Sequence, residues 1–139
     1  MIQEQGYPVF WNNKKPQQMP FKYLLREVPF TNIYGGKSKT EFVLHSKQRA
    51  IRIEAKYQAA AGSVDEKLVY TLLNAIQCYP EKEIILLLEG QGFRKGAREW
   101  ILKMLDSNWL NYRNKKTIHC FTLKQFRNWF QKEITANEL

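Results

Sequence analysis

The chain has 139 residues and a formal net charge of +9, from 22 Lys and Arg against 13 Asp and Glu. The length predicts one domain with a sizeable core, and the 44% hydrophobic content is typical of a globular fold rather than a disordered chain. The basic balance favours a polyanionic partner, of which nucleic acid is the commonest, with solubility and an anionic membrane surface as alternatives.

Several classes of protein are disfavoured by what the sequence lacks. No run approaches the roughly 18 apolar residues of a membrane span, and the first residues lack the charged start and apolar block of a signal peptide, so we expect a cytoplasmic protein without membrane association. Cys78 and Cys120 are typical of buried reduced thiols. They have no zinc-ligand spacing with His45 or His119.

The first part of the chain predicts a lead-in followed by a helix. Residues 1–17 are polar and irregular, which indicates a flexible arm ahead of a single domain over 18–139. Pro20 suits a first helical position, and the helix is expected to end before Pro29. The apolar residues at helical spacing between them are Phe21, Leu24, Leu25 and Val28.

Two strands are then expected, over 39–46 and 49–57, after a turn at Gly35 and Gly36. In the second strand, alternation places Ile51, Ile53, Ala55 and Tyr57 on one face. The opposite face carries Arg52, Glu54, Lys56 and Gln58.

This polar row contains a candidate catalytic site. Glu41 lies in the first of the two strands, and pairing the strands can bring it alongside Glu54, with Lys56 adjacent. Two carboxylates that share a divalent cation, with a lysine beside them, form a candidate site for cutting phosphodiesters.

The rest of the chain predicts alternating helices and strands. Ser63 with Glu66 has the spacing of a capping box before a helix that ends at Pro80. The other expected elements are a buried strand over 83–88, a helix over 94–106, a strand over 117–121 and a final helix capped by Thr122 and Gln125. The glycines at 90, 92 and 96 lack dinucleotide-loop spacing, so no nucleotide cofactor is expected.

Two motifs carry a family resemblance: the acid at Glu41 with the Glu54-Ala55-Lys56 tripeptide, and the strings IEAKYQAAAGSVDEKLVY and YPEKEIILLLEGQGFRKGAREW. The sequence resembles the PD-(D/E)XK nuclease superfamily, in particular small stand-alone members from bacteria and mobile elements. The resemblance covers about residues 20–130. It implies an α/β fold with a restriction-endonuclease-like αβββαβ core, in which helices flank a central mixed sheet.

The resemblance also implies roles for individual residues. Glu41 and Glu54 would hold Mg²⁺, for which Mn²⁺ would substitute, with the backbone carbonyl of Ala55 as a third ligand. Lys56 would aid the attacking water, and Gln58 would orient that water or a phosphate. The sequence departs from the family pattern at Glu41, where the family usually has Asp.

Plainer readings of the acidic residues stay open. Glu54 and Lys56 also fit a cross-strand charge ladder, and Glu41 an ordinary strand-start carboxylate. The family often adds an acid from the first helix, where only Glu27 is available. Glu66 is an accessory candidate whose simpler role is helix capping.

A nuclease of this kind is expected to bind DNA through lysines and arginines near the strand ends, with an affinity that falls steeply with salt. These are Lys37, Lys39, Lys47 and Arg49, with Arg52 as a further phosphate contact or surface residue. The prediction is a metal-dependent DNA endonuclease, with a homodimer as one arrangement that would cut both strands. The alternatives are a catalytically silent nucleic-acid-binding protein of the same fold and a basic RNA-associated protein.

Overall fold

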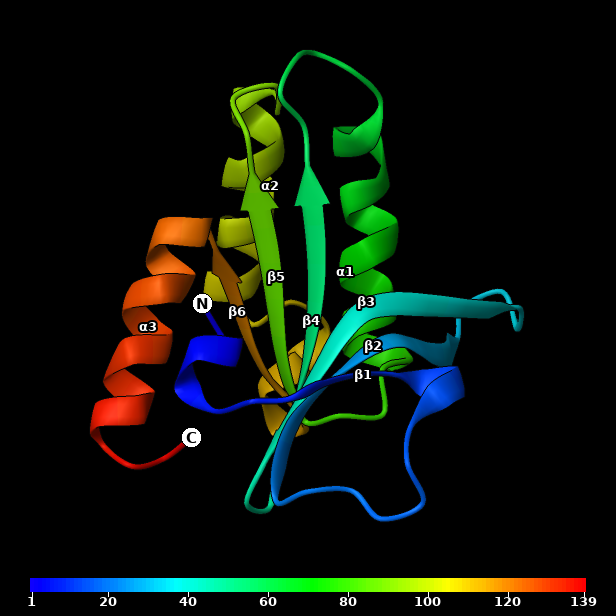
Figure 1. Ribbon diagram of the computed structural model, residues 1–139. Coiled ribbons are helices and arrows are strands. Elements are labelled where there is room, and N and C mark those ends of the chain that lie inside the picture. The colour runs from blue at the N-terminus through cyan, green and yellow to red at the C-terminus, as the bar shows by residue number, and fades with distance from the viewer.

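The computed structural model describes all 139 residues and contains one six-stranded mixed sheet flanked by helices, which confirms the predicted α/β class (Figure 1). The strands lie in chain order across the sheet: β1 (Val9–Trp11), β2 (Lys22–Thr31), β3 (Lys37–Ser46), β4 (Arg49–Tyr57), β5 (Glu83–Glu89) and β6 (Thr117–Phe121). The pairs β2–β3 and β3–β4 are antiparallel, whereas β1–β2, β4–β5 and β5–β6 are parallel.

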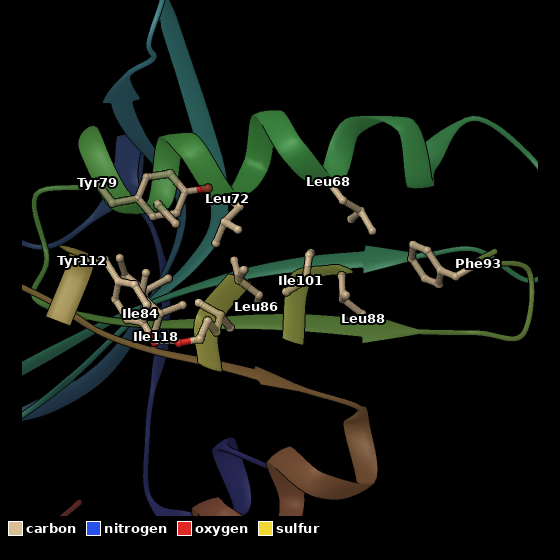
Figure 2. Close-up of a cluster of buried hydrophobic side chains, with 12 residues drawn as sticks. Leu68, Leu72, Tyr79, Ile84, Leu86, Leu88, Phe93, Ile101, Tyr112 and Ile118 are labelled. Carbon is tan, nitrogen blue, oxygen red and sulfur yellow. Dashed lines mark hydrogen bonds between the residues drawn. The ribbon is translucent and has the colours of Figure 1, made fainter. Parts of the chain in front are cut away.

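Three α-helices cover the sheet: α1 (Leu68–Gln77), α2 (Lys95–Asp106) and α3 (Leu123–Thr135). One face packs against α1 and α2, where Leu72, Leu86 and Ile101 belong to a continuous apolar cluster (Figure 2). The other face packs against α3 through Ile53, Ile85 and Phe126. Because helices cover both faces of the sheet, the side chains of β5 are apolar in a continuous run, as is typical of buried parallel strands.

The predicted helix over residues 20–28 is wrong, because this segment forms β2. Leu24 and Leu25 are both buried, although neighbouring strand residues point to opposite faces. A strand covered on both faces therefore mimics helical spacing. Pro29 is tolerated because β1 pairs only with residues 24–26, so Pro29 lies in the part of β2 that has an open edge.

The segment 1–17, expected as a flexible lead-in, carries the edge strand β1 and a fully buried aromatic residue. The Tyr7 ring packs 5.9 Å from the ring of Phe130 on α3, measured between ring centroids. These residues therefore complete the layer on the α3 face of the sheet.

The later elements match the sequence more closely. β5, α2, β6 and α3 occupy the predicted positions, and Thr122 and Gln125 form the predicted capping box on α3. The box expected at Ser63 and Glu66 does not form. There the chain makes a 3₁₀ turn, Val64–Lys67, ahead of α1, and the Ser63 side chain makes no capping hydrogen bond.

Strands β3 and β4 diverge halfway along β4. We call this point of divergence the fork, and the candidate site lies there. Their pairing ends at Phe42 and Ile53, whereas β4 stays paired with β5 as far as Tyr57. Figure 1 shows β3 turning away from β4 at the upper end of the shared region. Glu27 on β2, opposite this point, has a φ of 57°, a backbone conformation in which the strand is distorted. The fork leaves residues 54–57 with one edge free of β3.

Candidate active site

Glu54 and Lys56 lie just beyond the fork, on the face of β4 that packs toward α1. The Glu54 side chain is buried, with a residue exposure of 8%. Its Oε1 lies 2.7 Å from the Nζ of Lys56, and the lysine side chain is about one quarter exposed. A buried carboxylate thus has a cation beside it that can still reach solvent.

Glu41 lies on the other arm of the fork. The β3–β4 pairing ends at Phe42 and Ile53, so Glu41 and Glu54 are the next residues along the two diverging strands. Glu41 is exposed, and its negative charge makes a smaller contribution than burial to the raised pKa of Glu54. Glu54 and Lys56 are therefore in contact on one arm of the fork, and Glu41 lies on the other arm beside the point where the pairing ends.

The Glu54 pKa is raised mainly because burial disfavours the ionised carboxylate. The hydrogen bond and charge of Lys56 oppose this effect, the negative charge of Glu41 adds to it, and Arg52 opposes it weakly. Perturbation of this kind, from desolvation and a specific charged partner, is concentrated at functional sites.

The oxygen atoms available at the fork limit which metal ion the site can hold. Nowhere in the chain do three or more His, Cys, Asp or Glu side chains form a group that could hold a metal ion. A cation at the fork would therefore depend on Glu41, Glu54, backbone oxygen and water. Mg²⁺ fits such a set because it prefers oxygen and keeps several of its waters. A dication would also relieve the repulsion that the two acids impose on each other.

Gln58, expected to orient a water or a phosphate, has both ends of its amide bonded to backbone. Its Nε2 donates to the carbonyl of Gly92 at 2.8 Å, and its Oε1 accepts from the N–H of Val64 at 2.8 Å. The loop after β5 is pressed against it, since a Cβ at Gly90 would overlap the Gln58 carbonyl. Gln58 thus fixes the end of β4, and Lys56 with it, to the loop before α2.

Arg52, a candidate phosphate contact, lies in the interior with 1% exposure. Its guanidinium donates to both oxygens of Glu81, at 2.5 and 3.0 Å, and to the Thr40 hydroxyl at 2.8 Å. It also donates to the carbonyls of Val28 and Pro29. These bonds use all five N–H groups of the guanidinium, so Arg52 has no donor left for a ligand. Its role is to join β4 to β2, β3 and Glu81 beside the fork.

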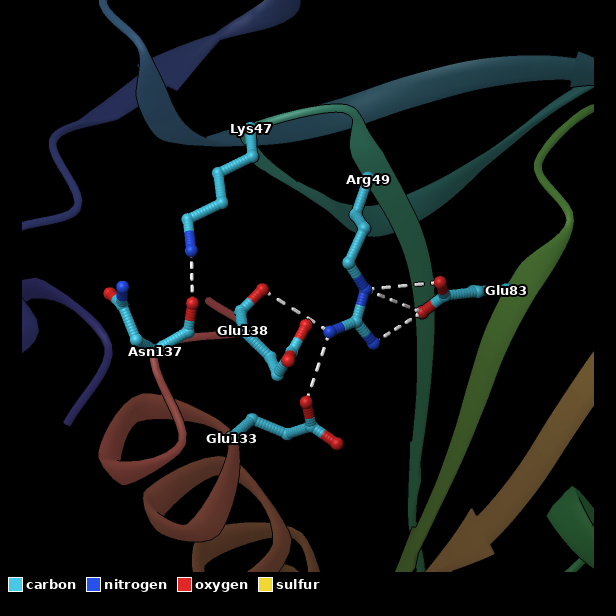
Figure 3. A network of polar contacts seen from close by, with 6 residues as sticks. All are labelled: Lys47, Arg49, Glu83, Glu133, Asn137 and Glu138. Atoms are coloured by element: carbon cyan, nitrogen blue, oxygen red, sulfur yellow. Dashed lines mark hydrogen bonds and ion pairs between the residues drawn. The ribbon is translucent and has the colours of Figure 1, made fainter.

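Lys47 and Arg49 lie at the far end of β4 from the carboxylates, in a network with the C-terminal segment (Figure 3). Arg49 contacts Glu83 at 2.7 Å and Glu133 at 3.0 Å, and Lys47 donates to the Asn137 carbonyl. Five residues of strand separate Arg49 from Glu54, about 16 Å. These two cations therefore do not flank the site, and their visible role is to tie α3 to the sheet.

Lys37 and Lys39 lie on the same arm of the fork as Glu41. Lys37 is exposed, and Lys39 forms a 2.6 Å ion pair with Glu27. Glu27 is thus neutralised on β2, and the first-helix acid of the family has no counterpart, because this segment is a strand. Glu66 is exposed on the 3₁₀ turn and lies 3.6 Å from Arg94.

Tyr79 is a site neighbour that the sequence analysis did not single out. It is buried, its ring lies 5.3 Å from the Arg52 guanidinium, and burial together with the Glu54 charge raises its pKa. The sequence holds no signal for this role, because Tyr79 stands between the end of α1 and Pro80 and belongs to no periodic pattern.

Comparison with known proteins identifies the family of this chain. A model of the PD-(D/E)XK nuclease superfamily domain matches residues 2–134. Searches of curated proteins and of solved structures found no match. No helix is long and apolar enough to cross a membrane. A six-stranded mixed sheet flanked by helices is consistent with the restriction-endonuclease-like fold of that family. From its sequence match and its fold, the chain belongs to the PD-(D/E)XK nuclease superfamily, which suggests nuclease activity.

Proposed function

We propose that this protein is a Mg²⁺-dependent endonuclease that hydrolyses DNA phosphodiester bonds at the fork between β3 and β4. The observation that carries the proposal is the buried Glu54 carboxylate, whose pKa is raised by burial and by Glu41 and which has Lys56 at 2.7 Å. In an ordinary surface charge ladder, the carboxylate would be exposed rather than buried, and no second carboxylate would repel it. The basic net charge supports a nucleic-acid substrate.

The positions of these residues suggest a separate role for each of them in the reaction. Glu41 and Glu54 would hold the cation from the two arms of the fork, with the Ala55 carbonyl on the free edge of β4. When bound, a divalent cation neutralises phosphate charge and lowers the pKa of a bound water. Lys56, partly exposed, would orient the attacking water and stabilise the charge that develops on the phosphate oxygens. Gln58 would keep Lys56 in place through its bonds to Gly92 and Val64.

Each chain has one set of these residues, so one chain would cut one strand at a time. We propose that two copies act on a duplex, with each set cutting one strand. Nicked intermediates would then precede double-strand breaks, and the linear product would grow relative to the nicked product as protein concentration rises.

Lys56→Ala is expected to lower the single-turnover rate of DNA cleavage by about 10²- to 10³-fold, the usual cost of losing one preorganised charge-stabilising donor. The measurement is cleavage of an end-labelled duplex with Mg²⁺ at saturating protein. Lys103→Ala on α2 is the matched control, because it removes the same charge from an exposed position. Equal rates for wild type and Lys56→Ala would contradict the proposal, whereas binding without any cleavage by wild type would favour a silent DNA-binding protein.

A further inference from the structure

The turn between β2 and β3 presents an exposed aromatic ring. Tyr34 is 82% exposed, the highest fraction among the exposed large hydrophobic side chains. One face of its ring stacks on Tyr70 of α1, with centroids 5.7 Å apart and planes 15° apart. The high exposure leaves the opposite face of the Tyr34 ring to solvent. An aromatic ring placed in this way contributes little to the core.

The turn that carries Tyr34 is held in place by hydrogen bonds. The Asn32 Oδ1 accepts from the N–H groups of Tyr34 and Gly36, at 2.9 and 3.1 Å. The N–H of Ile33 donates to Asn74 Oδ1 on α1 at 3.0 Å, so the turn is fixed to the helix. Because the backbone of the turn is already held, binding of a flat partner to the ring needs little further ordering of the backbone.

Two basic residues lie close in sequence to the stacked rings, and one of them is on the strand that carries Glu41. Lys37 follows the turn, and Lys67 stands three residues before Tyr70; both are exposed. Glu41 lies four residues after Lys37 on β3, about 13 Å along the strand.

We propose that Tyr34, backed by Tyr70, is a stacking platform for an unpaired base of the substrate. A base inside a duplex has both faces covered by its neighbours, so an exposed ring stacks on bases in single-stranded segments. Lys37 and Lys67 would contact the phosphates on either side. The inference rests on the proposed function and specifies its substrate class as DNA with a single-stranded stretch, such as an overhang.

The test measures binding in the presence of chelator, so that no cleavage occurs. The probes are a duplex with a single-stranded overhang carrying 2-aminopurine, whose fluorescence reports stacking, and the same duplex with blunt ends. Tyr34→Ala should weaken binding to the overhang probe by about 5- to 150-fold, the usual cost of losing one base–aromatic stack. It should leave blunt-duplex binding unchanged. Tyr34→Phe keeps the ring and should bind like wild type.

Phe21→Ala is the matched control, since Phe21 is also a highly exposed aromatic but precedes the other end of β2, near Lys47. It should bind both probes like wild type. Unchanged overhang binding by Tyr34→Ala, or an equal loss on both probes, overturns the platform and leaves the nuclease proposal standing. If wild type binds neither probe, the proposed function fails, and the platform fails with it.

Discussion

Glu54→Gln is expected to abolish cleavage and to leave the protein at least as stable as wild type at neutral pH. The amide keeps the shape of the side chain but removes the charge that would hold the cation, so we expect at least a ~10²-fold loss of rate. The stability gain has a separate cause. Burial raises the Glu54 pKa, so the folded state loses stability as pH rises through that pKa and the carboxyl ionises in place.

The pH dependence of this gain can be checked by thermal unfolding. Above the raised pKa of Glu54, the variant should melt at or above the wild-type temperature. At a pH below the ordinary glutamate value, the carboxyl is protonated in both folded and unfolded states, and the advantage should vanish. Glu99→Gln, at an exposed position on α2, should change neither cleavage nor this pH dependence. A variant that is clearly less stable than wild type at neutral pH would show that Glu54 is a structural carboxylate.

Arg52→Met is expected to destabilise the fold by about 3–5 kcal/mol, because it leaves a buried carboxylate without its partner. Glu81 has only 13% of its side chain exposed, and the Thr40 hydroxyl and the Val28 and Pro29 carbonyls would lose their donor as well. Such a loss is a large share of the total stability of a domain of this size. Urea unfolding followed by circular dichroism measures it.

Two further variants separate the ion pair from a general effect of the substitution. Arg127→Met, exposed on α3, should change stability by less than about 0.5 kcal/mol. Adding Glu81→Gln to Arg52→Met should recover part of the loss, because it removes the unpaired charge. If Arg52→Met cost less than about 1 kcal/mol, the pair would be a minor contact rather than the support of the fork.

The sequence predicted most of the fold, and the wrong prediction for β2 has a physical reason. β5 and α3 carry unambiguous signals, a bounded apolar run and a capping box, and both form as predicted. β2 carries the opposite signal to its structure, because burial on both faces gives it consecutive leucines at helical spacing. Its hydrogen-bonded pairing with β1 and β3 makes it a strand, and the spacing of its own apolar residues does not indicate that pairing.

Within the candidate site, the strand positions of Glu41, Glu54 and Lys56 could be predicted, and the partners of the two arginines could not. Glu41, Glu54 and Lys56 follow from strand alternation and pairing, which are local rules. Whether a given arginine contacts a ligand or an internal acid depends on residues far along the chain. Arg52 meets Glu81 and Arg49 meets Glu133, and nothing near either arginine in the sequence indicates these pairs.

The measurement that tests the central claim most directly is nicking and linearisation of a supercoiled plasmid by the wild-type protein, with Mg²⁺, with Mn²⁺ and with chelator. We predict cutting with either metal, none with chelator, and loss of cutting in Glu54→Gln. Cutting that persists in chelator or in Glu54→Gln would contradict a metal site built from Glu41 and Glu54. If wild type also fails to cut single-stranded and overhang-bearing DNA with either metal, the nuclease proposal is contradicted.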